Sequence, residues 1–423
     1  MLRKCNPIVA ILLTVSISNQ LANAQSEWNR FRGPNGTGKV DGEMSLPTEW
    51  DSTNGVRWKT KVLRGSSSPV FCGNQIILTG FSGYAQNANE PGDRASLRLH
   101  VMSYDFESGE ELWNVDFAAS ESEQEATKRI VDHGYASPTA CTDGERIFAT
   151  FGPSGVFAFD TAGQLLWKRD VGDGTAGFGA ASSPMLYANL VIINASIESK
   201  RLIAFDKESG ETVWELDGIE RAWTTPAIAN SDLGDELVIH FKNEIRALDP
   251  LSGEVLWYCE GIPDYVVPVP VVEKDVIYFS GGRQNRTIAV RVGGRGNVTK
   301  THVLWNVNRG ANVTTPLYHD GYLYWAHDKA FSQAMDASSG EVAYQERFEN
   351  RSRVYASVVC GDGKLYMTLR DGNTLVLKAE PKFSQLSVNK LGEDGEEFNS
   401  TPAIKDSSLI VRSTKYLYRI TKQ

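Results

Sequence analysis

The sequence predicts an all-β fold, an eight-bladed β-propeller built from four-stranded antiparallel blades. One hairpin sequence recurs along the chain as DFESGEELW, DKESGETVW, DPLSGEVLW and DASSGEVAY. A small residue followed by proline also recurs at a nearly constant spacing, and the two ends of the chain supply complementary strands. Repeats of about 40 to 45 residues with four short strands each are typical of propeller blades.

The small residue and its proline mark the start of each repeat. They occur at Ser68-Pro69, Ser137-Pro138, Ser183-Pro184, Thr225-Pro226, Val269-Pro270, Thr315-Pro316 and Thr401-Pro402, and Ser357-Val358 fills the remaining place. The intervals between the second residues of these pairs are 69, 46, 42, 44, 46, 42 and 44. The spacing therefore predicts eight units, the first of which contains a large insertion.

Each unit has room for four strands and for no amphipathic helix of convincing length. In the unit from Pro184, short apolar and β-branched runs such as LVIINAS and RLIAFD alternate with turns rich in Gly, Asn, Asp and Ser. The last unit, from Pro402, has only three such runs. VRWKT near the other terminus supplies the fourth, so we expect an N-terminal strand to pair with the C-terminal blade and close the ring.

Three segments follow from this arrangement. Residues 55–423 form the single propeller, and residues 25–54 form an irregular arm that either packs on the propeller or binds another molecule. Residues 1–24 have the pattern of a signal peptide, in which Arg3 and Lys4 precede an apolar run and Ala22-Asn23-Ala24 offers a cleavage site. We therefore expect export to the periplasm or the exterior, with no transmembrane segment and no lipid anchor.

The formal net charge of -9 and the pI near 5.4 argue against a nucleic-acid partner. Cleavage would leave four cysteines, which are Cys72, Cys141, Cys259 and Cys360. Their spacing matches no zinc or redox motif, so we expect free thiols.

The recurring hairpin has a structural explanation. Its Asp accepts hydrogen bonds from the turn amides, its Gly takes a positive φ, and the aromatic residue at its end covers the neighbouring blade. The residues expected to dock blades in this way are Trp58, Trp113, Trp167, Trp214, Trp257, Trp305 and Tyr344. Blades two, five and seven depart from the pattern, at Asp160, Arg291 and Lys378, and should dock less regularly.

The stretches AFDKESGETVW and ALDPLSGEVLW resemble the tryptophan-docking repeat of the pyrroloquinoline-quinone (PQQ)-like propeller family. The resemblance covers essentially the whole mature chain. This family includes quinoprotein alcohol dehydrogenases and the non-enzymatic subunit BamB of the outer-membrane β-barrel assembly machinery, to which the chain is closest in kind. The resemblance implies a propeller but no particular activity, because the motif builds blades.

We expect function at the face that contains the longer loops and the links between blades. The residues just before each inner strand should converge there around the central opening. They are His133, Tyr135, Phe178, Arg221, Trp223, Tyr265, Asn312, Arg353, Tyr355 and Asn399. Aromatic side chains with Arg and Asn suit a ligand or an extended peptide.

No catalytic residue and no metal ligand can be assigned from the sequence. The enzymes of the resembled family hold calcium with Glu, Asn and Asp and usually have adjacent cysteines, and Cys-Cys is absent here. The favoured interpretation is an exported, monomeric, non-catalytic scaffold without cofactor, with an envelope protein, peptide or glycan as partner. The alternatives are a PQQ- and calcium-dependent alcohol or sugar dehydrogenase and a carbohydrate-binding envelope propeller.

Overall fold

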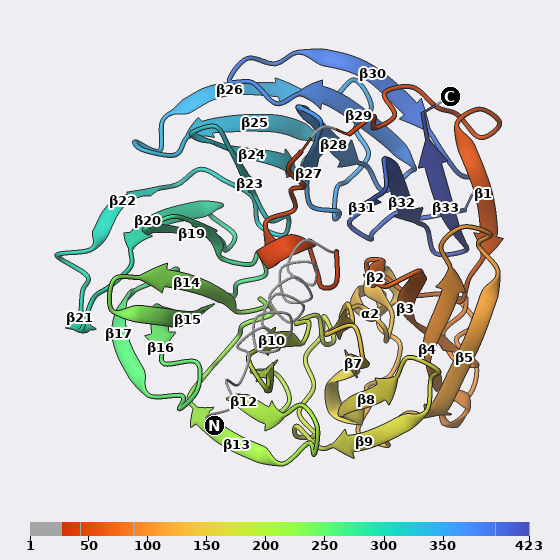
Figure 1. Ribbon diagram of the computed structural model, residues 1–423, viewed down its shortest axis with the longest axis horizontal. Helices are drawn as coiled ribbons and strands as arrows, with labels where there is room; N and C mark the ends of the chain where they lie inside the picture. The colour runs from red at the N-terminus through yellow and green to blue at the C-terminus, as the bar shows by residue number, and fades with distance from the viewer. Residues whose placement is uncertain (1–27, 43, 88, 394, 423) are drawn as a thin grey trace, which may run out of the picture.

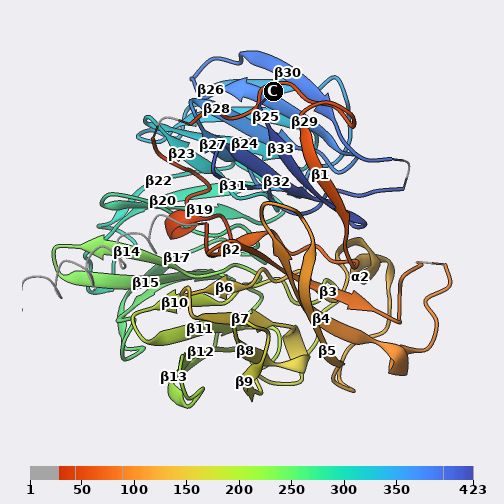
Figure 2. The same cartoon turned by 45° about the vertical axis from the view of Figure 1, so that its right-hand side comes forward.

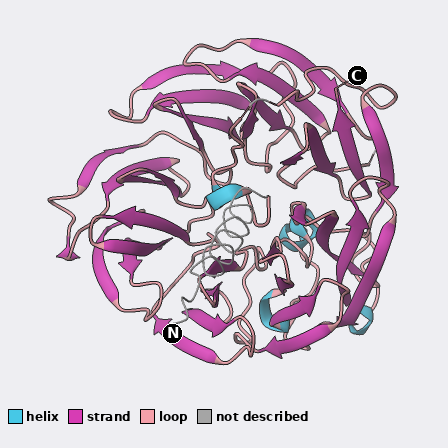
Figure 3. Ribbon diagram, viewed as in Figure 1, coloured by secondary structure: helices cyan, strands magenta, loops and turns pink. Residues whose placement is uncertain are grey.

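The fold is an eight-bladed propeller, as the repeats predict (Figure 1). The computed structural model describes residues 28–42, 44–87, 89–393 and 395–422. Eight antiparallel sheets of four strands surround a central axis, and one of them gains a short fifth strand. The predicted signal peptide lies outside the described residues. Strands dominate the ring, with only short helical turns between them (Figure 3).

The first four blades follow one another along the chain. Blade 1 contains β2 (Val70–Cys72), β3 (Gln75–Ser82), β4 (Arg98–Asp105) and β5 (Glu111–Ala118). Blade 2 contains β6 (Cys141–Thr142), β7 (Arg146–Thr150), β8 (Val156–Asp160) and β9 (Leu165–Arg169). Blade 3 contains β10 (Met185–Tyr187), β11 (Leu190–Ala195), β12 (Arg201–Asp206) and β13 (Thr212–Asp217). Blade 4 contains β14 (Ala227–Ser231), β15 (Gly234–Phe241), β16 (Glu244–Leu248) and β17 (Val255–Glu260).

The remaining blades complete the ring. Blade 5 contains β18 (Val271–Glu273), β19 (Val276–Gly281), β20 (Arg286–Arg291) and β22 (Val303–Val307), and its loop strand β21 (Gly296–Asn297) pairs with β17 of blade 4. Blade 6 contains β23 (Leu317–His319), β24 (Tyr322–His327), β25 (Phe331–Asp336) and β26 (Val342–Arg347). Blade 7 contains β27 (Val359–Gly361), β28 (Lys364–Thr368), β29 (Asn373–Lys378) and β30 (Gln385–Lys390). Blade 8 contains β31 (Ala403–Lys405), β32 (Ser408–Arg412), β33 (Tyr416–Thr421) and β1 (Val56–Lys61).

In the residues that the structure describes, helical structure lies outside the blades. It comprises η1 (Pro34–Gly36), η2 (Arg94–Ser96), η3 (Gly152–Ser154) and α2 (Lys128–His133). Among the described residues, no helix has the length and apolar character that crossing a membrane requires.

Blade 8 closes the ring with strands from both ends of the chain. β1 pairs antiparallel with β33, so that Val56 lies opposite Ile420 and Lys61 opposite Tyr416 (Figure 2). The buried Arg412 of β32 also donates to the backbone carbonyls of Ser67 and Leu63, which lead into blade 1. The predicted closure is confirmed, and β1 covers the edge of β33 that would otherwise be open.

The core lies between neighbouring blades. Middle strands such as β11 are buried along their whole length, whereas the outer strands alternate between half-buried and exposed residues. A strand that is covered on both faces reads as a continuous apolar run, and a half-covered strand alternates. This is why LVIINA is so much more apolar than the outer strand ELWNVDFA.

The recurring hairpin fastens each blade to the preceding one. In blade 3, the Asp206 carboxylate accepts hydrogen bonds from the backbone N–H groups of Ser209 and Glu208, which lowers the pKa of Asp206. Gly210 has a φ of 70° and lies against the indole of Trp167 from blade 2. The Trp167 indole N–H donates to the carbonyl of Lys207 at 3.2 Å. Turn and ring together form one clasp between two blades.

The same clasp recurs around the ring. The indole N–H groups of Trp58, Trp113, Trp214 and Trp305 donate to carbonyls of the next blade, which belong to Phe106, Thr161, Pro250 and Ala337. Tyr344 instead shares a hydrogen bond with Ser332 of its own blade. The shortened turn of blade 2 still receives Trp113, because Gly163 keeps its place under the ring.

Trp257 lacks this partner because the next blade has no Asp-Gly turn. It is fully buried and donates to Glu236 Oε2 at 2.8 Å. Glu236 also accepts from the backbone N–H of Gly293, in the long loop of blade 5. The loop that replaces the turn thus joins the two blades by β21 and by this buried carboxylate.

The clasp glycines are predicted to tolerate no side chain. A Cβ on Gly253 would lie 2.7 Å from two ring carbons of Trp214, and the residue has a φ of 73°. We expect Gly253→Ala to lower the free energy of unfolding by about 3 kcal/mol, from backbone strain and overpacking together. Gly363→Ala is the matched control, since Gly363 has a φ of 66° and nothing within 4 Å of the added Cβ. It should cost only about 1 kcal/mol in urea unfolding, and equal losses would contradict the clasp.

The arm, residues 28–54, crosses the central channel and then runs over blades 7 and 8. The carbonyls of Trp28 and Asn29 accept from the inner strands of blades 1 and 2, at Phe71 and Thr142. Farther on, Lys39 forms an isolated parallel bridge with Cys360 of blade 7. In Figure 1 the arm and η1 occupy the centre of the ring. Of the two roles left open by the sequence, packing is the one seen here.

Candidate ligand-binding site

The central channel contains a cavity of about 500 Å³, here called the mouth cavity. Its wall is formed by the links that lead into the inner strands, on the face that contains the longer loops. Phe31 of the arm also lines it. The arm bonds to positions one to three residues farther along the inner strands, such as Pro316, Val358 and Cys360. The cavity therefore has an open end at the links and a floor made by the arm.

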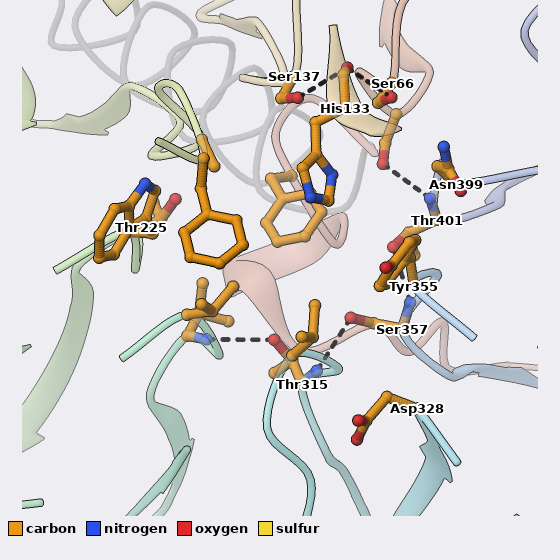
Figure 4. Close-up of a pocket in the computed structure, with 18 of the residues that line it drawn as sticks. Ser66, His133, Ser137, Thr225, Thr315, Asp328, Tyr355, Ser357, Asn399 and Thr401 are labelled. Atoms are coloured by element: carbon orange, nitrogen blue, oxygen red, sulfur yellow. Dashed lines mark hydrogen bonds between the residues drawn. The ribbon is translucent and has the colours of Figure 1, made fainter. Parts of the chain in front are cut away.

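Eight of the ten predicted site residues line this cavity. They are His133, Phe178, Trp223, Tyr265, Asn312, Arg353, Tyr355 and Asn399. They come from seven different links, and His133, Tyr355 and Asn399 lie around the same opening in Figure 4. The structure thus brings together most of the residues that the repeat period places in front of the inner strands.

Tyr135 and Arg221 do not line the cavity. The Tyr135 ring is buried against Phe81 and Tyr84, and its hydroxyl donates to the carbonyl of Gln124 at 2.8 Å. Arg221 is exposed and has a φ of 54°, just before Ala222 bridges to Val266. Placing these two residues at the opening was wrong, because the links are not extended there and a shift of two residues turns a side chain away.

Aromatic rings form one side of the cavity wall. The ring centroids of Phe178, Trp223 and Tyr265 lie 6.0 to 6.1 Å apart, and the Trp223 ring is edge-on to both neighbours. The Trp223 indole N–H donates to the carbonyl of Gly179 at 2.7 Å, which fixes the ring. Across the opening, His133 and Tyr355 are 5.3 Å apart. Such a rigid aromatic wall can bind a flat or apolar group at little cost in side-chain entropy.

More basic than acidic side chains line the cavity. Arg353, Lys329 and a single carboxylate, Asp328, line it. Asp328 Oδ1 accepts the backbone N–H of Asn312 at 3.5 Å. Burial lowers the pKa of His133, so its imidazole is neutral at neutral pH. The cavity lining therefore favours negative over positive ligands.

Two side-chain amides present acceptors with no donor. Asn312 donates through Nδ2 to the Tyr265 hydroxyl, and Asn399 donates to the carbonyl of Asp132, each at 3.0 Å. The Oδ1 atoms of both are buried and have no partner among the described residues. A buried polar atom without a partner costs about 1–3 kcal/mol, so these two are the natural contacts for a ligand that supplies donors.

Below the aromatic wall, side-chain hydroxyls form a belt around the axis, here called the hydroxyl ring. Its members are Ser68, Thr139, Ser183, Thr225, Thr315, Ser357 and Thr401. Each hydroxyl oxygen accepts the backbone N–H of the residue at the matching position one blade earlier, at 2.9 to 3.1 Å. Figure 4 shows Thr315, Ser357 and Thr401 in this succession. At the eighth position Val269 has no hydroxyl, and the ring is broken there.

The hydroxyl ring explains the residue that precedes proline in most repeats. In blade 2 the ring member is Thr139, after Pro138, and not Ser137, so the register taken from Ser137-Pro138 was wrong by two residues. Ser137 instead donates to the carbonyl of His133. Phe31 and the ring were not among the predicted site residues. The hydroxyl at seven of eight repeats was the available signal for the ring, whereas nothing in the arm sequence indicates Phe31.

The cavity lining does not fit a PQQ and calcium site of the kind held by Glu, Asn and Asp ligands. It offers one carboxylate, and the described part of the chain has no cluster of three or more His, Cys, Asp or Glu residues placed to hold a metal ion. All four cysteines expected in the mature chain are buried and lie outside the lining, and Cys141, Cys259 and Cys360 are free thiols, as expected.

Two buried glutamates lie in the loops on the same face. Burial raises the pKa of Glu123 and that of Glu198 to about 7, from an ordinary value of 4.5. Glu123 also accepts a hydrogen bond from Ser154 at 2.9 Å. Because the folded protein holds these protons more tightly than the unfolded chain, their contribution to stability is complete below pH 4.5 and is lost as the pH rises through about 7.

We therefore expect the stability of the wild-type protein, measured relative to Glu123→Gln and relative to Glu198→Gln, to fall by roughly 3 kcal/mol between pH 4.5 and 7.5. The comparison with each variant is needed because burial lowers the pKa values of His133 and His240, and these histidines make stability rise with pH over an overlapping range. Chemical unfolding across the range measures the differences, and the exposed Glu121→Gln should keep the wild-type pH dependence. A difference between the wild type and each Gln variant that does not change with pH would contradict the assignment.

The eight-bladed fold with its repeated tryptophan clasp is that of a PQQ-like propeller, and it encloses a cavity on its axis. Residues 97–346, more than half of the chain, match the family model described as outer membrane protein assembly factor BamB, and the chain belongs to this family. None of the curated proteins matches the sequence.

Solved structures of three kinds resemble it. BamB from Moraxella catarrhalis has a TM-score of 0.57 at 13% identity, covering 86% of this chain and 98% of that one. A quinohemoprotein alcohol dehydrogenase from Comamonas testosteroni has a TM-score of 0.67 at 12% identity, covering 96% and 82%. The computationally designed protein Ika8 has a TM-score of 0.57 at 13% identity, covering 90% of this chain and 100% of that one. At such identities the likeness is one of fold alone.

Proposed function

We propose that the protein is a non-catalytic binding scaffold of the cell envelope whose ligand occupies the mouth cavity. The observation that carries the proposal is the cavity itself. It is closed by the arm at one end, open at the other, walled by fixed aromatic rings and supplied with polar atoms that have no partner. A volume of about 500 Å³ with a few convergent polar groups is typical of sites for small ligands or for the end of a chain.

The lining supports binding better than catalysis. Nucleophilic catalysis needs a nucleophile hydrogen-bonded to a base, and the base oriented by a third group. No lining hydroxyl bonds to the His133 ring in the described part of the chain, and the ring hydroxyls are occupied as acceptors of backbone N–H groups. General acid–base work by paired carboxylates would require a second carboxylate beside Asp328.

The location in the envelope rests on the family and on the signal-like N-terminal sequence. The family model is named for an outer membrane protein assembly factor. An exported scaffold would meet envelope proteins, peptides or glycans, and the acidic charge of the chain disfavours nucleic acid.

The proposal can be tested by capture of ligand from an envelope extract on the purified protein, with the released molecules identified by mass spectrometry. Trp223→Ala and Tyr265→Ala should each reduce the captured amount at least about fivefold, since aromatic anchors dominate binding energy. Tyr258→Ala is the matched control, because Tyr258 is 40% exposed on the outer strand β17 and lies outside the cavity. Equal capture by all three variants would overturn the assignment of this cavity.

A second measurement addresses the enzymatic alternative. The protein is incubated with PQQ and calcium, washed, and assayed for retained cofactor and for dye reduction with alcohols and sugars. The scaffold proposal expects neither retention nor turnover. Stoichiometric retention accompanied by turnover would overturn it.

A further inference from the structure

We propose that the hydroxyl ring is an anion site, and that the ligand of the mouth cavity is an organic anion whose carboxylate or phosphate group lies on the propeller axis against this ring. The inference rests on the proposed binding function and adds the chemical class of the ligand. Three independent features of the described residues lead to it.

The first feature is an excess of hydrogen-bond donors. Each hydroxyl has one proton to donate in addition to its acceptor lone pairs. The seven ring hydroxyls accept backbone N–H groups, and none of them donates to any described residue. All seven side chains are at least 95% buried and line the cavity. Several buried O–H donors without acceptors, arranged around one axis, fit a group that consists of acceptors only.

The second feature is the charge beneath the ring. Arg32, one residue after Phe31, is fully buried, and all its hydrogen bonds go to backbone carbonyls. One of these carbonyls belongs to Thr315, a ring member, and another belongs to Val358, next to Ser357. Among the described residues no carboxylate pairs with Arg32, and its charge is balanced by backbone carbonyls alone. An anion on the axis would supply the missing counter-charge.

The third feature is the sign of the groups that face the cavity. Arg353 and Lys329 outnumber Asp328, and His133 is adjacent to aromatic rings and not to a cavity carboxylate. The rings of Phe178, Trp223 and Tyr265 stand on the open side of the hydroxyl ring and would contact the body of the ligand. The arrangement suits an anion attached to an aromatic body that carries N–H or O–H donors for the unpartnered Oδ1 atoms of Asn312 and Asn399.

Binding of small probes tests the proposal directly. The probes are 3-phenylpropionate and phenyl phosphate, and 3-phenylpropionamide is the uncharged match. Binding is measured by quenching of tryptophan fluorescence and by isothermal titration at low salt. We expect both anions to bind at least about tenfold more tightly than the amide, because hydrogen bonds to an ionised acceptor are about twice as strong as neutral ones. The preference between the two anions identifies the group as a carboxylate or a phosphate.

Three variants assign the effect to the ring. Thr315→Val removes one donor and should weaken binding of the preferred anion about tenfold. Val269→Thr completes the ring, and should strengthen binding about threefold to tenfold. It should also raise the melting temperature, since no described residue accepts the backbone N–H of Thr225 at present and the new hydroxyl would do so. Thr374→Val is the matched control, because Thr374 is a buried hydroxyl of β29 that bonds Thr368 and lies outside the cavity.

Failure of this inference is separable from failure of the proposed function. If the amide or N-acetylglucosamine binds as tightly as the anions, and binding depends on Trp223 but not on Thr315, the cavity remains a binding site and the anion inference is overturned. If no probe binds at millimolar concentration, the anion inference is likewise overturned. The capture experiment with Tyr265→Ala then tests the proposed binding function independently. Unchanged anion affinity in both Thr315→Val and Val269→Thr, in proteins that unfold cooperatively, also excludes the ring.

Discussion

Replacing Trp257 with alanine should lower the free energy of unfolding by about 5 kcal/mol, the largest effect expected of any single clasp residue. Trp257 is fully buried at the junction of blades 4 and 5. The substitution leaves a cavity the size of an indole. Glu236, which is 1% exposed, also loses the indole N–H that donates to its Oε2 at 2.8 Å. Both losses act in the same direction, because the cavity forfeits packing and the carboxylate loses a partner in a place that water does not reach.

Urea unfolding followed by tryptophan fluorescence and circular dichroism measures this effect. Trp305→Ala is the matched control, because Trp305 is only half-buried and bonds the carbonyl of Ala337. It should cost about 2 kcal/mol. Trp257→Phe should lie between the two, since it keeps a ring and loses the N–H. Equal losses in Trp257→Ala and Trp305→Ala would show that the buried carboxylate contributes nothing to the junction.

Replacing Arg32 with methionine should lower the free energy of unfolding by about 3 kcal/mol and release the arm. Burial lowers the pKa of Arg32 to about 9, so the side chain is still charged at neutral pH. Removing the charge removes an unpaired buried cation, which is favourable. It also leaves the carbonyls of Pro316, Thr315 and Val358 without this donor, and Pro316 is the shortest contact at 2.7 Å. We expect the loss of donors to outweigh the gain from removing the buried charge, because three buried carbonyls without a donor cost about 1–3 kcal/mol each.

Limited proteolysis with trypsin reports release of the arm, because Lys39 lies at its bridge to Cys360. Cleavage there should become faster in Arg32→Met while the blades stay intact in circular dichroism. Arg98→Met is the control, as Arg98 forms a surface ion pair with Asp116 and its side chain is 42% exposed. Such a pair contributes about 0–1 kcal/mol. An arm that is cut no faster in Arg32→Met than in Arg98→Met would contradict its role as the fastening of the channel floor.

The architecture was predictable because every blade repeats the same local solution. A turn that begins with Asp206 and needs a positive φ at Gly210 can be recognised without knowing its neighbours, and its recurrence gives the period. Trp58 could be assigned to the closing blade for the same reason. The hydrogen-bond partner of Trp257 could not be predicted. Its indole N–H donates to Glu236, and the position of Glu236 depends on a loop 57 residues away, at Gly293.

The candidate site was predictable only in part. The repeat period correctly brings Trp223, Tyr265 and Asn312 to one cavity, since the period fixes which residue precedes each inner strand. It fails in blade 2, where α2 occupies the link and the ring member becomes Thr139. It also contains no information on the floor, because Arg32 bonds residues 283 to 326 positions away and no local pattern reports such contacts.

The closing blade also determines when the protein is complete. Val56 pairs with Ile420, so the final sheet joins segments separated by nearly the whole chain. Contacts between such distant segments form slowly. Until they form, β1 has no partner strand and β33 has an open edge beside the seven finished blades. Open strand edges are the surfaces through which chains aggregate, so the nascent protein is most vulnerable just before its last step. A chain cut short before β33 would remain in that state permanently.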